Sequence, residues 1–459
     1  MNILFNKAME ALLVIYALFI GLTFLFDRSF VGIMIYGYQL GKMMVGASFL
    51  VCLIVIVLTI LKKYPEPLNE FSDSAKILSF IFLTFILSLL INGTDFFSSY
   101  TFKSSSYIWV NGYLFLSVFI FTKLNSQKKL IDIFIYALMA IPFVHYFFST
   151  GYYPNFIMDV FIKYSDKFTF NKASDIMISL VSINLIVSVV LKNKLIKLVY
   201  AILTTSLLLP LLLLMSRGSF LSALFFIIGT LFIDWRYLKE NLRHTFLLTV
   251  IAVVTFIGST YNVGDVNFDF NLNFGSEQNE ESLSESIQKI AKKNNTRKAF
   301  LSFYFQDGRI YSVDNTTNWR LDIWQDVIED MNSKNLFIKG YGYNEIIPVM
   351  LDPSAPGRLG RDGLNENVHN YFINILARGG IVQLLIFILF HCSYLTIWYK
   401  KFGNLNILVF FLPVMINSSL DITMEGVQFP FIYYSMLGIL YNLNPGYKEI
   451  SKDLESEPI

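Results

Sequence analysis

A histidine at the end of a long polar segment is well placed for proton transfer. Residues 261–368 are polar, charged and aromatic, whereas the sequence on either side is almost continuously apolar. His369 closes this segment, and the next apolar stretch begins after Asn370. Because an imidazole has an unperturbed pKa of about 6.5, it can act as a general base at neutral pH. A lone histidine at such a boundary is more often structural, so position alone leaves both roles open.

An arginine in a tight connection is the second candidate. Arg217 lies in a Ser-Arg-Gly-Ser sequence between two apolar stretches. Because burying a charge at mid-membrane costs about 3 kcal/mol or more, this guanidinium needs an anionic partner. A guanidinium stays protonated and binds phosphate oxygens as a planar fork. The partner could therefore be a phospholipid headgroup or the diphosphate of a lipid-linked substrate.

Three further arginines carry open interpretations. Arg378 follows His369 on the same apolar stretch and could line the same cavity or extend outward to the membrane surface. Arg358 and Arg361 lie among glycines and prolines that predict a mobile loop. They could close over an anion or simply remain solvated.

One helix with a distinct apolar face is predicted within the polar segment. Its apolar residues recur at helical spacing: Leu321, Trp324, Val327, Ile328 and Met331. Arg320 precedes Trp324 by four residues, so the two share one side of the helix. Gly340-Tyr341-Gly342 follows and predicts a turn, which glycine allows because it has no Cβ.

Composition indicates an all-α integral membrane protein. Hydrophobic residues make up 54% of the chain and charged residues 15%, with a mean hydropathy of +0.53. Soluble domains carry about 25% charged residues. A membrane-spanning helix needs about 20 apolar residues, and the sequence predicts twelve spans: 9–26, 43–61, 76–92, 106–122, 130–149, 174–191, 195–214, 218–234, 245–260, 370–398, 405–420 and 428–443.

The positive charges orient these spans. With a cytoplasmic N-terminus, the inner loops and the C-terminal tail hold 17 lysines and arginines, and the short outer loops hold 7. The positive-inside rule therefore predicts both termini in the cytoplasm and the long loop outside. The expected organisation is transmembrane helices over 1–260, an extracytoplasmic loop domain with short helices over 261–368, transmembrane helices over 369–443 and a cytoplasmic tail over 444–459.

Three segments are predicted less simply. Residues 29–42 could form a re-entrant or interfacial piece, and the aromatic residues 299–313 could pack on a small core or lie on the membrane interface. Gly379-Gly380 interrupts a span and predicts a kink or a close helix contact.

The remaining chemistry is limited by what the sequence lacks. Cys52 and Cys392 both fall within predicted spans, so we expect no disulfide framework. The sequence has no zinc pattern, and its carboxylates have no spacing that demands a divalent metal. We therefore expect no metal and no cofactor. The net charge of +2 gives no indication of nucleic-acid binding.

These residues together resemble the bacterial O-antigen ligase and O-antigen polymerase superfamily. The family pattern is His, then Asn, Ser or Gln, then nine residues and Gly, then two residues and Gly, Thr or Tyr. Here it reads His369-Asn370, then Gly380, but Gln383 stands at the last position. Three shorter matches follow the family order: Ser216-Arg217-Gly218, Arg320 with Trp324, and Gly340-Tyr341-Gly342.

The resemblance implies glycan transfer at the outer face of the bacterial plasma membrane. Its donor would be an oligosaccharide on undecaprenyl diphosphate. Arg217 and Arg320 would bind the diphosphate, with Arg378 and Arg361 as further candidates. His369 would activate the acceptor hydroxyl for inverting attack. The structural motif residues would be Asn370, Trp324, Gly340, Gly342 and Gly380.

Three functions remain open on this basis. We favour a polymerase, in which the acceptor is another lipid-linked repeat unit. The alternative is a ligase, whose acceptor is lipid A-core or a protein. A transporter or flippase of the same lipid would predict inverted repeats and ionisable residues deep in spans. The sequence has no such repeat, and Asp132, Asp175 and Asp421 lie near span ends. Expected partners are membrane lipids, with a chain-length regulator and a flippase as candidates.

Overall fold

Every predicted span forms helix in the computed structural model, which describes residues 2–122, 128–166, 168–264, 302–355, 357–359, 363 and 365–443. The helices that correspond to the predicted spans are α1 (Asn2–Val31), α2 (Leu40–Leu61), α3 (Ser72–Asn92), α5 (Ser106–Trp109) with α6 (Gly112–Phe121), α7 (Lys128–Ser149), α9 (Ala173–Val190), α10 (Lys194–Met215), α11 (Arg217–Glu240), α12 (Leu242–Gly264), α15 (Tyr371–Phe402), α16 (Leu408–Leu420) and α17 (Gln428–Leu443).

Shorter elements connect them. The helical ones are η1 (Glu66–Phe71), α4 (Ser99–Ser104), α8 (Asn155–Tyr164), α14 (Asn315–Ser333), η3 (Pro348–Leu351) and η4 (Thr423–Glu425). The strands form two antiparallel hairpins, β1 (Met34–Ile35) with β2 (Tyr38–Gln39), and β3 (Phe303–Gln306) with β4 (Arg309–Ser312).

The count of twelve spans is not confirmed. Within the described residues, nine helices are long and apolar enough to cross a membrane. Ser106–Phe121 and Leu408–Leu420 are apolar but shorter, and α17 has 16 residues. These three segments fall short of the roughly 20 residues that a full crossing needs. One of them, α16, ends where Asp421 turns the chain into η4, beside His369.

The core of the bundle lies around α9 and α17. In α9, 78% of the most apolar window is buried, against 11% in α12 at the periphery. The helix α17 is buried along nearly its whole length and packs against α6, while α15 packs against α3 and α11 against α16. A helix that is apolar on all sides must be covered by other helices or by lipid. These helices therefore form the scaffold that positions the two ends of the bundle.

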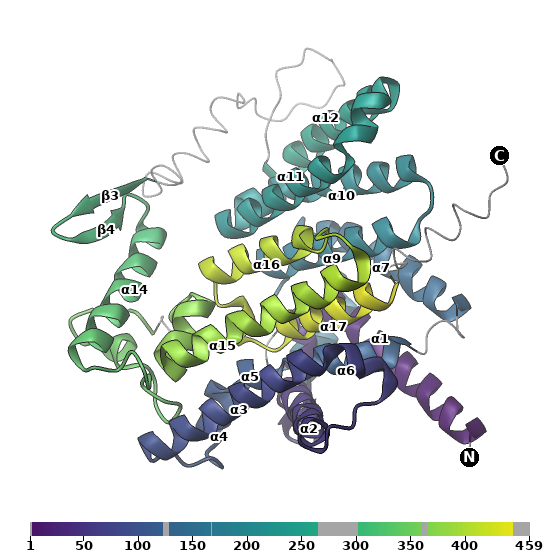
Figure 1. Cartoon of the computed structure of the whole chain (residues 1–459). Helices are drawn as coiled ribbons and strands as arrows, with labels where there is room; N and C mark the ends of the chain where they lie inside the picture. Colours follow the sequence, from purple (N-terminus) through teal and green to yellow (C-terminus); the bar gives the residue numbers. More distant parts are fainter. Residues whose placement is uncertain are drawn as a thin grey trace.

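The two ends of the bundle differ in what they carry (Figure 1). At one end lie α14 and the β3–β4 hairpin, and we call this the loop end. At the opposite end α1 begins, α17 ends and α9 connects to α10. That connection contains Lys192 and is followed by Lys194, the first residue of α10. We call this the lysine end.

Residues 29–42 and 299–313, for which the sequence left two structures open, each contain a β-hairpin. Within 29–42, α1 ends and the β1–β2 hairpin follows, with Met34 opposite Gln39. Residues 303–312 form the β3–β4 hairpin, in which the Tyr304 and Tyr311 rings stack across the strands. The long loop carries the expected helices, α14 and η3, and this hairpin in addition. The consecutive aromatic residues Phe303, Tyr304 and Phe305 favour a strand, because aromatic side chains are enriched in strands.

The paired glycines in α15 break the helix, as predicted. Gly380 has φ 74° and ψ 179°, a conformation open essentially only to glycine. The break frees carbonyl groups of Ala377 and Arg378, which accept the backbone N–H groups of Tyr341 and Gly342 at 2.7 and 3.0 Å. In return, Ile381 N–H donates to the Phe337 carbonyl at 2.7 Å.

This exchange fixes the long loop onto the bundle. A Cβ on Gly340 would lie 2.4 Å from the Arg378 carbonyl oxygen, and one on Gly380 would lie 2.0 Å from that of Ile338. The predicted glycine turn and the predicted helix break are thus two halves of one contact.

Candidate functional site

The pair His369-Asn370 forms the start of α15. The Asn370 Oδ1 accepts the N–H groups of Phe372 and Ile373, which satisfies two of the free donors at the helix start. Its Nδ2 donates to the Ser419 carbonyl at the end of α16, at 3.0 Å. His369 has φ 56°, unusual for a residue with a side chain. Asn370 therefore fixes the backbone that presents His369.

The His369 ring contacts three groups. Its Nε2 lies 2.8 Å from the Asn365 Oδ1, its Nδ1 lies 3.9 Å from the Asp421 Oδ1, and its ring meets the Trp319 ring edge-on at 4.9 Å between centroids. Because the Asn365 oxygen accepts, Nε2 carries the hydrogen and Nδ1 bears the lone pair. Nδ1 has no hydrogen-bond partner among the described residues. The ring is therefore oriented with a free basic nitrogen.

Asp421 lies between His369 and Arg320. Burial raises the pKa of the Asp421 carboxyl, but the interaction with His369 and the positive charge of Arg320 outweigh burial and leave that pKa below its usual value. Asp421 thus stays ionised and can stabilise a protonated imidazole.

Arg217 begins α11 and pairs with the long loop. Ser216 caps the helix, its Oγ accepting from the Ser219 N–H. The Arg217 guanidinium lies 3.1 Å from the Asp314 Oδ1. The other oxygen of Asp314 accepts the Thr317 N–H and caps α14. The anionic partner that the sequence required is therefore a loop carboxylate, which holds the start of α14 against the start of α11.

Arg320 lies on α14 within two turns of the cap Asp314. Its environment differs from that of Arg217. Its guanidinium makes no hydrogen bond or ion pair with any residue that the structure describes, and its Nε is buried. Burial lowers the pKa of this guanidinium, and the charges of Asp421 and Asp314 offset burial only in part. A partly buried arginine without a paired carboxylate is suited to an external anion.

Two of the predicted residues serve the framework of the loop. Trp324 packs in the small core beneath the loop, and its Nε1 donates to the Val368 carbonyl at 2.7 Å. Arg378 is 2% exposed and donates to the carbonyls of Glu345 and Gly342 and to the Tyr100 hydroxyl. It therefore lies in the docking contact of the glycine turn.

Of the loop arginines Arg358 and Arg361, the structure describes only the first. Arg358 is buried and binds Asp322, Asp326 and the Val349 carbonyl, so the expectation of a solvated or mobile side chain is wrong. Arg361 lies outside the described residues.

Gln383, which departs from the family pattern, has a defined role in packing. Its Oε1 accepts from the Tyr107 hydroxyl at 3.0 Å and from the Tyr343 hydroxyl at 2.5 Å. Tyr343 belongs to the long loop and Tyr107 to α5. The glutamine therefore adds a second attachment of the loop to the bundle, close to the break at Gly380.

Several site residues were missed by the sequence reasoning. Asp421 was considered only as a charge near a span end, and Asp314, Asn365 and Trp319 were not singled out. Lys172 also lies within electrostatic range of Asp421. A detectable signal was that Asp421 directly follows an apolar stretch at the end of the bundle where His369 was expected. The others come from turns and loop positions whose neighbours only the fold supplies.

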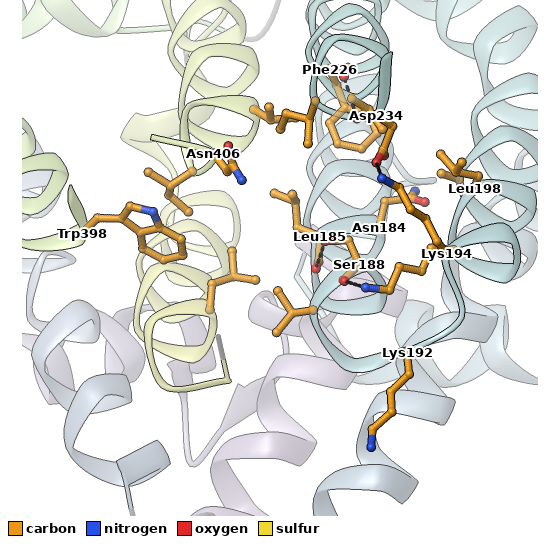
Figure 2. Close-up of a pocket in the computed structure, with 18 residues that line it drawn as sticks. Asn184, Leu185, Ser188, Lys192, Lys194, Leu198, Phe226, Asp234, Trp398 and Asn406 are labelled. Carbon is orange, nitrogen blue, oxygen red and sulfur yellow. Dashed lines mark hydrogen bonds and ion pairs between the residues drawn. The ribbon is translucent and has the colours of Figure 1, made fainter. Parts of the chain in front are cut away.

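Two cavities lie at opposite ends of the bundle. The loop-end cavity has a volume of about 520 Å³ and is lined by residues of α2, α4, α15 and the connection after Asp421. The lysine-end cavity has a volume of about 450 Å³ and lies between α9, α10, α11 and α16. Figure 2 shows the Lys194 ammonium directed at the Asp234 carboxylate at the edge of this second cavity, 2.9 Å away.

One family model matches part of this chain. The model of the O-antigen ligase family matches residues 201–388. The match begins within α10 and ends within α15, so it includes Arg217, Arg320 and His369 and stops before Asp421. No curated protein matches the chain. The apolar helices and this match indicate a multi-pass membrane protein, and members of the matched family are enzymes of the glycosyltransferase type. More narrowly, residues 201–388 are similar to the O-antigen ligase family, which supports the superfamily that the sequence motifs resemble.

Proposed function

We propose that this protein transfers an oligosaccharide from a polyprenyl diphosphate to an acceptor hydroxyl at the outer membrane surface. The observation that carries the proposal is the unpaired guanidinium of Arg320, within electrostatic range of Asp421 and, through it, of His369. Arg217 reaches the same region through Asp314. An anion-binding group and a base on adjoining elements are the two parts that transfer from a diphosphate requires.

The proposed reaction uses each residue once. The acceptor oxygen attacks the anomeric carbon and forms the new glycosidic bond, with inversion. The bond from that carbon to the diphosphate oxygen breaks, and the lipid diphosphate leaves with the electron pair. The acceptor hydroxyl proton goes to the His369 Nδ1. Arg320 and Arg217 neutralise the charge that develops on the diphosphate, and ionised Asp421 stabilises the imidazolium.

We infer that the acceptor is a second lipid-linked repeat unit, which makes the protein a polysaccharide polymerase. A ligase that transfers the finished glycan to lipid A-core or to a protein would use the same residues. The proposed location is the bacterial plasma membrane, with both termini in the cytoplasm and the site outside. The excess of lysine and arginine in the inner loops and tail supports this orientation. The donor is proposed to be linked to undecaprenyl diphosphate.

The test is substitution of the base and of one arginine in cells. His369→Ala and Arg217→Ala are expressed in a host lacking the native protein, and the surface glycan is resolved by size. Loss of a polymerase leaves single repeat units on the final anchor, whereas loss of a ligase leaves long chains on the lipid carrier. His244→Ala and Arg236→Ala, both at the lysine end, serve as matched controls. Normal glycan in both site variants would refute the assignment.

A further inference from the structure

The loop-end cavity contains polar groups that nothing in the proposed reaction uses. Both carboxyl oxygens of Glu425 and the Oδ1 of Asn374 are buried and lack a hydrogen-bond partner among the described residues. The Nε of Arg28 is in the same state. All three residues line the cavity. Because buried polar groups in proteins almost always find partners, a group of them around one cavity indicates that a ligand supplies the missing bonds.

The charged and hydrogen-bonding groups that line the cavity indicate the chemistry of that ligand. The cavity wall carries the cations Arg28, Lys42, Lys103 and Arg378, and the carboxyls Asp166, Glu366 and Glu425. Lys103 and Glu366 pair at 2.9 Å, and Arg378 donates to backbone carbonyls and to Tyr100. The lining atoms without a partner are the two Glu425 oxygens and the Asn374 Oδ1, together with the Nε groups of Arg28 and Arg378. An anion could satisfy only the two Nε groups, because it cannot donate to the three oxygens. A neutral molecule with many hydroxyl groups fits better, because it both donates and accepts.

The protonation of Glu425 agrees with such a ligand. Burial raises the pKa of this carboxyl to about 8, with a further contribution from the negative charge of Asp421. At neutral pH Glu425 is therefore mostly a protonated acid, which can donate one hydrogen bond and accept another. A sugar hydroxyl has the same dual capacity.

The cavity shares its walls with the site around His369. Glu366 precedes His369 by three residues, and the Asn374 N–H donates to the Asn370 carbonyl one turn earlier in α15. Ile422, which lines the cavity, directly follows Asp421. A molecule in the cavity therefore lies beside the base, on elements other than α11 and α14, which carry Arg217 and Arg320.

We propose that the loop-end cavity binds the terminal sugar of the acceptor glycan, and that Glu425 and Asn374 hydrogen-bond to its hydroxyl groups. The donor diphosphate then binds at Arg320 and Arg217, and the acceptor enters from the side of α2 and α4. The volume of about 520 Å³ is within the range of about 300–1,000 Å³ that small-molecule sites occupy. This inference rests on the proposed function, because it assigns the second substrate of the same reaction.

The experiment separates the two substrates with two probes. Farnesyl diphosphate, which has no sugar, reports on the diphosphate site. The repeat-unit oligosaccharide, released from the host's own surface glycan, reports on the cavity. Binding of each to the purified full-length protein is measured by titration calorimetry. Glu425→Ala and Asn374→Ala are expected to weaken the oligosaccharide by about tenfold or more and to leave farnesyl diphosphate within twofold. Arg320→Ala is expected to weaken the binding of farnesyl diphosphate by about tenfold or more and to leave that of the oligosaccharide within twofold.

A conservative variant tests the chemistry at Glu425. Glu425→Gln keeps a donor and an acceptor at the same position, so it should bind the oligosaccharide within about threefold of the unsubstituted protein. Glu240→Gln, at the far end of α11, is the matched control. The inference is overturned if Glu425→Ala binds the oligosaccharide normally, or if it weakens both probes equally. Farnesyl diphosphate binding that does not change in Arg320→Ala would instead count against the proposed function.

Discussion

The loop-end cavity and the lysine-end cavity are close in volume, at about 520 and 450 Å³, but their polar groups are partnered differently. At the lysine end, Lys194 pairs with Asp234, Lys197 donates to the Ser188 carbonyl, and Asn184 donates to Thr204. Among the described residues, no side chain lining that cavity has a buried polar atom without a partner. At the loop end, Arg28, Asn374, Arg378 and Glu425 each have one or more.

This difference indicates where the protein keeps binding energy available. A hydrogen bond made within the protein contributes to its stability, whereas a buried polar group without a partner can form a hydrogen bond with a ligand. The volumes of the two cavities do not distinguish them. The state of their polar groups separates them, because the end whose buried groups lack partners is also the end that carries Arg320 and His369.

The comparison is tested most strongly at Arg320. Arg320→Ala should lower the rate of glycan transfer by about 100-fold or more, because it removes a charge that stabilises the leaving diphosphate. The measurement is the initial rate of chain extension by purified protein with lipid-linked oligosaccharide. Arg236→Ala, whose side chain is 91% exposed near the lysine end, should stay within twofold. Equal losses in both variants would mean that the effect is general instability.

The break in α15 should matter more than a comparable glycine at the lysine end. Gly380→Ala forces an alanine into a strained conformation against the Ile338 carbonyl and should cost about 1–3 kcal/mol or more. The expected result is a lower unfolding temperature in detergent and a loop that proteases cut faster. Gly403 also has a positive φ, of 68°, but space around its missing Cβ. Gly403→Ala should therefore cost less, about 1 kcal/mol; a larger loss there than at Gly380 would contradict the docking contact.

Removing the charge of Asp421 should slow transfer without unfolding the protein. Asp421→Asn keeps the size of the side chain but no longer stabilises protonated His369. We expect a loss of about tenfold in kcat, equivalent to about 1.4 kcal/mol, with the affinity for farnesyl diphosphate changed little. The exposed Asp73, near the lysine end, gives the control Asp73→Asn. An unchanged kcat would exclude Asp421 from the reaction.

The smallest effect is expected at the edge of the lysine-end cavity. Asp234→Asn breaks the pair with Lys194, whose side chain is 44% exposed, and partly exposed ion pairs contribute about 0–1 kcal/mol. Transfer should therefore stay within about twofold, and the unfolding temperature should fall by little. A loss of transfer similar to that of Arg320→Ala would show that both ends take part in the reaction.

Much of the framework could be predicted from the sequence. The apolar segments become helices at nearly the expected residues, because a run of about 20 apolar residues has few other stable forms in a membrane. The break at Gly379-Gly380 could be predicted too, since glycine pairs weaken a helix locally. The number of full spans could not, because the lengths of α5–α6, α16 and α17 depend on where neighbouring elements end them.

The candidate site divides in the same way. The sequence by itself determined which side chains are chemically suited to the reaction: an imidazole, which can accept a proton, and guanidinium groups, which bind anions. Only the tertiary structure decided which arginine is paired and which is open to a ligand. Arg358 and Arg320 are both loop arginines, yet one is bound to two aspartates and the other to none among the described residues. Partnership across the fold depends on contacts between distant segments, such as Arg217 with Asp314 and His369 with Asp421, and spacing along the chain does not specify such contacts.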